Sequence, residues 1–237
     1  MGATDPTSRM VELLGRLRRE MNGAVADSMR VRGRSYGLNY GVSLPTIRAI
    51  ARSCPPDHAF ARYLFLQDVR ELRLAALTLA EPRRVVAAEF DAWGAGIVNS
   101  EVAEEAAFAL LSRTECVREL YAAWMAATDP LLRYAALLSA ARSRSVPVQE
   151  ALAPLPALAA DFPEDLLLAD GVVALLASVG TDRPEGRDAV LRVVGTLPQI
   201  ATSGMESRYA VAMPVTRFVA PGPEVDITTP TLPVALA

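Results

Sequence analysis

Arginine and tyrosine side chains gather in the first quarter of the chain in a pattern that suits phosphate binding. Residues 1–52 contain nine arginines against four acidic residues, whereas the whole chain has a formal net charge of −3. All 24 basic residues are arginine, whose planar guanidinium donates paired hydrogen bonds to phosphate oxygens. Basic groups interleaved with aromatic rings can follow a nucleic-acid backbone and stack on bases. The candidate nucleic-acid-binding residues of this region are Arg30, Arg32, Arg34, Tyr36, Tyr40, Ser43, Arg48 and Arg52.

The same residues also have a structural interpretation. The arginines can form a solvated face that pairs with nearby carboxylates, and Tyr36 and Tyr40 can fill the core of the first repeat. Residues 53–237 carry the acidic excess of the chain, which suits a protein partner better than DNA. The sequence leaves both interpretations open.

Other kinds of catalytic or ligand-binding chemistry have little support. His58 is the only histidine, and because it follows a helix-capping residue we expect it on the surface. A lone histidine supplies neither a metal site nor the base for serine or cysteine catalysis. Cys54 and Cys116 show no partner pattern and are expected to be reduced, as in a cytosol. Gly-rich phosphate loops are absent, so we expect no metal and no cofactor.

Helices must position these side chains, because the composition favours helix throughout. Alanine and leucine dominate, while alternating runs of β-branched residues are scarce. Caps and turns predict helices over 8–21, 23–31, 44–54, 58–67, 148–160, 164–179 and 184–197. The Gly- and Tyr-rich segment 33–45 is expected to be non-helical up to Ser43, which caps the next helix.

The middle of the chain contains an internal repeat. LRLAALTLA (72–80) and LRYAALLSA (132–140) match at six of nine positions, sixty residues apart, and EEAAFALLS (104–112) lies midway. A period near 30 residues with a break inside each period indicates helix–turn–helix units that stack into one core. The sequence therefore predicts an all-α fold, an α-solenoid. Arg73 and Arg133 occupy the same repeat position, and we expect both on the concave binding face, where ion pairing is the alternative.

Beyond the repeats the helical pattern weakens. We expect a helical domain over residues 1–200 and a weakly ordered tail over 201–237, with at most one weak helix at 206–218. No uncharged apolar stretch reaches 18 residues, and no secretory signal pattern is present. The chain is thus expected to lie in the cytoplasm and to make no membrane contact.

Three segments give the chain a resemblance to a known family. YGVSLPTIRAIAR (40–52) resembles the motif that opens the second helical repeat of AlkD-type DNA alkylation repair proteins. VRELRLAALTLAEP (69–82) resembles the family's next repeat, and DPLLRYAALL (129–138) the repeat that carries its phosphate-contacting arginine. The resemblance covers roughly residues 8–197 and is closest to divergent bacterial members. It implies a right-handed superhelix of HEAT-like repeats and a phosphate contact by Arg133.

The resemblance also implies an activity, but not its usual residues. AlkD-type enzymes excise cationic N3- and N7-alkylated purines, using an aspartate and flanking tryptophans. Aligned without gaps, the aspartate falls on Ala107 and the tryptophans on Val102, Ala103 and Val173. Glu104 and Glu105 are then the candidate catalytic carboxylates, because a negative charge near a developing oxocarbenium lowers the barrier. Trp93 and Trp124 are expected in the core.

Two functions follow from these observations. The first is a DNA alkylation repair-like protein that binds duplex DNA on a concave arginine-bearing face and, if it is an enzyme, acts as a DNA glycosylase. The second is a non-enzymatic HEAT-like scaffold that binds a protein partner in its concave groove.

Overall fold

The structure is a computed structural model, and it describes residues 5–31 and 36–197. Within those ranges all regular secondary structure is helical, apart from a single bridge between Leu38 and Val69. The α-helices are α1 (Pro6–Arg18), α2 (Gly23–Val31), α3 (Leu44–Arg52), α4 (His58–Phe65), α5 (Arg70–Leu79), α6 (Phe90–Ala95), α7 (Ser100–Ala109), α8 (Val117–Met125), α9 (Pro130–Ser143), α10 (Val148–Leu152), α11 (Leu155–Asp161), α12 (Leu166–Asp182) and α13 (Gly186–Val194). Short 3-10 helices cover Pro82–Arg84, Ala87–Glu89 and Leu111–Arg113.

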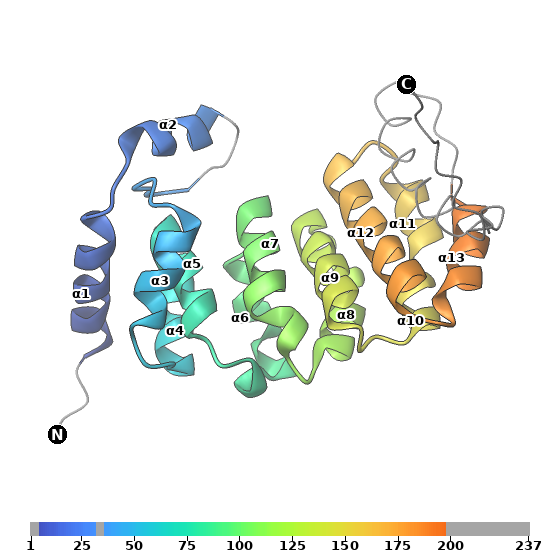
Figure 1. Ribbon diagram of the computed structural model, residues 1–237, viewed down its shortest axis with the longest axis horizontal. Helices are drawn as coiled ribbons and strands as arrows, with labels where there is room; N and C mark the ends of the chain where they lie inside the picture. Colours follow the sequence, from blue (N-terminus) through green and yellow to red (C-terminus); the bar gives the residue numbers. More distant parts are fainter. Residues whose placement is uncertain (1–4, 32–35, 198–237) are drawn as a thin grey trace, which may run out of the picture.

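The helices stack in pairs along one direction, from α1 at one end to α13 at the other (Figure 1). The second helices of successive pairs are α3, α5, α7, α9 and α12, and we call them the second-helix row. Each packs extensively on the next, whereas the first helices α4, α6 and α8 make few contacts with one another. Because an array curves toward its more closely spaced side, the second-helix row forms the inner face. The expected all-α solenoid is confirmed.

Capping residues account for most of the helix starts. The side chain of Ser43 accepts a hydrogen bond from the Thr46 amide and that of Asp57 from the Phe60 amide, both as expected. The first helix begins earlier than predicted, because Asp5 caps it through the Ser8 amide. The helix expected over 148–160 is two short helices, α10 and α11.

Small and large side chains alternate in the core. The alanine pairs at 75–76 and 135–136 are fully buried, and the pair at 106–107 is almost fully buried. Alanine lets helix backbones approach closely, so these three pairs set the spacing of α5, α7 and α9. Trp93 and Trp124 are also buried, with 2% and 3% of their surface exposed, which confirms the core position expected for them.

Several expectations concern residues that the structure leaves undescribed. The tail at 201–237 and the weak helix at 206–218 lie outside the described residues, as do Arg32 and Arg34. Among the described helices, none combines the length and apolar character that crossing a membrane requires.

Candidate nucleic-acid interface

A groove crosses the inner face. One open cavity of about 560 Å³ lies between α7, α9 and α12. A second, of about 270 Å³, lies between α3 and α7. Glu104 and Phe108 line both cavities, so the two form one inner groove with these side chains at its middle. Other charged residues that line it are Arg48, Glu101, Glu105, Arg142, Arg144 and Asp182.

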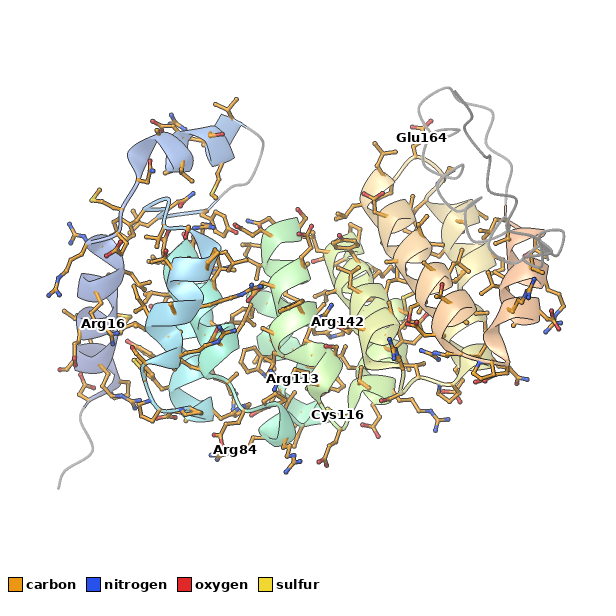
Figure 2. All side chains as sticks on the ribbon, viewed as in Figure 1. Arg16, Arg84, Arg113, Cys116, Arg142 and Glu164 are labelled. Atoms are coloured by element: carbon orange, nitrogen blue, oxygen red, sulfur yellow. The ribbon has the colours of Figure 1, made fainter. Side chains whose placement is uncertain are left out.

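Phe108 is the central aromatic side chain of the inner groove. It is 43% exposed, an unusual degree for a phenylalanine. The Arg48 guanidinium carbon lies 4.9 Å from its ring centroid and that of Arg142 lies 3.9 Å away. These arginines come from α3 and α9, which lie on either side of α7 in the row. Figure 2 shows Arg142 in the middle of the array, far from Arg84 at its lower edge.

Glu105 anchors Arg48 in place. The Arg48 Nε donates to one carboxylate oxygen at 2.9 Å, and its Nη2 donates to the other. The hydrogen bond that the guanidinium donates to this carboxylate raises the pKa of Arg48, and Glu105 itself is only 3% exposed. Glu105, expected as a candidate catalytic carboxylate, therefore has both oxygens occupied by one guanidinium.

Glu104 is an accessible carboxylate at the middle of the groove. Its side chain is exposed and accepts a hydrogen bond from the Tyr134 hydroxyl at 3.3 Å. Burial of the hydroxyl, followed by the negative charge of Glu104, raises the pKa of Tyr134. The phenol thus stays protonated and orients the carboxylate. Of the two candidate carboxylates, only Glu104 can face a ligand in the groove.

A buried ionic network lies beneath the groove. Arg70 is 1% exposed, and its guanidinium donates to both oxygens of Glu101, at 2.9 and 2.7 Å. It also donates to the Val42 carbonyl at 2.8 Å and to Glu71 at 3.2 Å. Glu71 is fully buried and accepts hydrogen bonds from the backbone amides of Tyr40 and Val42. The network fixes residues 36–43 against α5 and α7.

The tyrosines of this segment have structural roles. The Tyr36 hydroxyl donates to the carboxylate of Glu101, and burial, reinforced by that carboxylate, raises the pKa of Tyr36. The Tyr40 ring packs on the core, with the Arg18 guanidinium 5.5 Å from its centroid. These contacts suit the structural interpretation of both tyrosines, and their stacking on bases stays a prediction.

The candidate residues of the N-terminal third that the structure describes differ in their partners. Arg30, on α2, pairs with Asp27 at 3.2 Å, far along the chain from the groove. Arg48 reaches the groove but is held by Glu105. Arg52 is exposed at the end of α3. Ser43 is occupied in capping α3. Two of the candidate arginines described in this region, Arg30 and Arg48, are therefore already paired with carboxylates.

Arg73 and Arg133 are equivalent, but their shared role is to brace a turn. The Arg73 Nε donates to the Gln67 carbonyl at 2.7 Å, and the Arg133 Nε donates to the Ala127 carbonyl at 2.6 Å, each six residues back. Arg73 also donates to the Gly96 carbonyl and is 6% exposed, which suits a structural role, and its contact with DNA stays a prediction. Arg133 is half-buried over the Phe162 ring.

His58 is buried rather than on the surface. It is 4% exposed, and its Nε2 lies 2.9 Å from the Glu89 carboxylate, which also accepts from Arg62 and from the Trp93 indole. The expectation of a surface histidine was wrong, because the 3-10 helix Ala87–Glu89 places Glu89 over the start of α4. No group of three potential metal-ligating side chains occurs among the described residues.

Sequence reasoning missed the residues at the centre of the groove. Phe108 follows Glu104 by four residues, so both lie on one face of α7, and that spacing is a signal for an exposed aromatic beside a carboxylate. Arg142 and the buried pair Arg70 and Glu101 gave no comparable local signal.

Two of three comparisons found known proteins that are similar to this chain. A family model described as "DNA alkylation repair enzyme" matches residues 13–153. A solved structure from a family described as related to the HEAT-like repeat DNA glycosylases, with affinity for branched DNA structures, superposes with a TM-score of 0.69. It shares 13% identity, and the match covers 91% of this chain and 95% of that one. A search of curated proteins found no match.

Proposed function

We propose that this chain, which belongs to the DNA alkylation repair enzyme family, binds duplex DNA across the second-helix row. The observation that carries the proposal is the inner groove, where Phe108 lies between Arg48 and Arg142 and beside the exposed Glu104. Arg142 has no carboxylate partner among the described residues, and Arg133 has none either. The Arg142 guanidinium is free to contact phosphates, and the Arg133 guanidinium keeps nitrogens other than the Nε that binds the Ala127 carbonyl.

The similarity to a family with affinity for branched DNA structures supports a nucleic acid as the ligand.

Cys54 and Cys116 are free thiols, and we place the protein in the cytoplasm, where such thiols stay reduced.

Replacing Arg142 by alanine is expected to weaken duplex binding roughly tenfold at low salt, because a charged hydrogen bond to phosphate is lost. The salt dependence of log K should become shallower by about 0.9, since one fewer counterion is released. Fluorescence anisotropy of a labelled duplex, titrated at several salt concentrations, measures both quantities. Arg84→Ala is the matched control, because Arg84 is exposed at the lower edge of the array and its one carboxylate partner within residues 5–31 and 36–197 is Glu81.

Two outcomes would count against duplex binding on this face. One is an affinity that does not respond to salt. The other is an equal loss of affinity in the Arg142 and Arg84 variants, which would move the contact surface elsewhere.

We propose Glu104 as the carboxylate that supports base excision. Its exposure, its position at the middle of the groove and its hydrogen bond from Tyr134 suit a fixed negative charge beside a sugar that becomes cationic. Glu104→Gln is expected to slow release of methylated base from alkylated duplex by about 100-fold or more. Chromatography of the released base measures the rate, with Glu119→Gln, an exposed carboxylate on α8, as the control. Unchanged release in the Glu104 variant would remove it from the mechanism.

A scaffold that binds a protein partner is the second candidate. It is favoured by the pairing of groove charges, because Arg48 is neutralised by Glu105 and Arg144 lies 2.8 Å from Asp182. A groove in which most cations are paired attracts DNA less strongly. Retention of a defined protein partner, together with no salt-dependent DNA binding, would favour this candidate.

A further inference from the structure

Phe108 differs from every other aromatic residue that the structure describes. The remaining tyrosine, phenylalanine and tryptophan side chains within 5–31 and 36–197 are buried or half-buried, whereas Phe108 is 43% exposed. Exposed aromatic surface is unfavourable in water, and it lies here in a groove rather than on a convex face. The ring is therefore placed where a planar ligand could cover it.

The two arginines at the ring are held very differently. Arg48 is fixed by both oxygens of Glu105, so it forms a rigid wall on the α3 side. Arg142 is exposed, and its guanidinium carbon lies 3.9 Å from the ring centroid. Within the described ranges, this contact is the only interaction of the Arg142 side chain. A cation–π contact of this exposed kind is weaker than stacking between a nucleobase and an aromatic ring. Arg142 can therefore give up its place on the ring to a base.

We propose that Phe108 is a stacking platform for an unpaired or unstacked nucleobase, and that Arg142 leaves the ring for a phosphate when the base arrives. The inference rests on the proposed DNA binding and names the kind of DNA that the groove selects. Freeing a base from a continuous duplex costs stacking and pairing energy, whereas a base beside a gap is already exposed. The groove therefore selects duplexes with interrupted stacking over continuous ones.

The test compares two probes of the same sequence, one a continuous duplex and one with a short single-stranded gap. The gapped probe carries 2-aminopurine as its first unpaired base, whose fluorescence is quenched on stacking. The wild-type chain should bind the gapped probe roughly tenfold more tightly and quench the fluorescence. Phe108→Ala should abolish both the preference and the quenching, whereas Phe108→Trp should keep them. Leu66→Ala, which trims another exposed apolar side chain, is the control for folding and for surface loss.

The possible results separate the two claims. If neither probe binds with salt dependence, the proposed function fails. If both bind but Phe108→Ala leaves the gap preference and the quenching intact, DNA binding stands and the stacking platform is wrong. A loss of preference in the alanine variant, with an unchanged unfolding midpoint and an unaffected Leu66 variant, supports the platform. If that midpoint falls, retention of preference by Phe108→Trp decides in favour of the platform, and its loss decides against it.

Discussion

Replacing Arg70 by methionine is expected to lower the free energy of unfolding by about 3–5 kcal/mol. The guanidinium neutralises Glu101 and Glu71, which are 7% and 0% exposed, and it also binds the Val42 carbonyl. Methionine fills a similar volume but removes the guanidinium that both buried carboxylates bind. Urea unfolding of the full chain, followed by circular dichroism, measures the loss.

Arg118→Met is the matched control for that prediction. Arg118 makes the same two-pronged contact with Glu150, but the two side chains are 62% and 45% exposed. An exposed pair contributes little because water already solvates both charges, so we expect almost no change. Similar losses of unfolding free energy in the two variants would contradict the large contribution to stability that we assign to the buried network. The backbone amides of Tyr40 and Val42 donate hydrogen bonds to Glu71. Their hydrogen exchange should accelerate only in the Arg70 variant.

Gly41→Ala is expected to destabilise the chain by about 2–4 kcal/mol. Gly41 has a φ of +69°, where an L side chain is strained, and an added Cβ would lie 2.0 Å from the Asn22 carbonyl oxygen and 2.7 Å from the Ala26 nitrogen. Both clashing atoms belong to the backbone at the start of α2, so relief requires that helix to shift. Differential scanning calorimetry or urea unfolding measures the effect.

Gly15→Ala is the matched control for the glycine prediction. Gly15 lies within α1, and nothing comes within 4 Å of an added Cβ. Alanine is the better helix former, so this variant should be more stable by about 0.5–1 kcal/mol. A Gly41 variant as stable as the wild type would show that the position of residues 36–43 against α2 does not depend on this close approach.

Residues joined by side-chain hydrogen bonds between repeats are separated in the sequence by about one repeat period. Arg70 and Glu101 are 31 residues apart, the Tyr121 hydroxyl meets a carbonyl 30 residues later, and Tyr134 reaches Glu104 across 30 residues. Adjacent repeats lie side by side, so a residue contacts its counterpart one period away. The period of about 30 residues was readable from the Ala-Ala pairs, but which of many charged pairs at that spacing would meet depended on helix rotation.

Most of the helices and caps, and the stacked-repeat architecture, could be predicted from the sequence. Ser43 and Asp57 cap helices, and the alanine pairs are buried, because these outcomes depend on residues within one or two turns. Which charged side chains are paired, and which side chains are exposed, could be seen only in the tertiary structure. Arg48 is held by a carboxylate 57 residues away, Arg73 braces a turn, His58 is buried by Glu89, and Phe108 is exposed in a groove. Charge pairing and exposure depend on how neighbouring repeats are turned against each other, which no local pattern specifies.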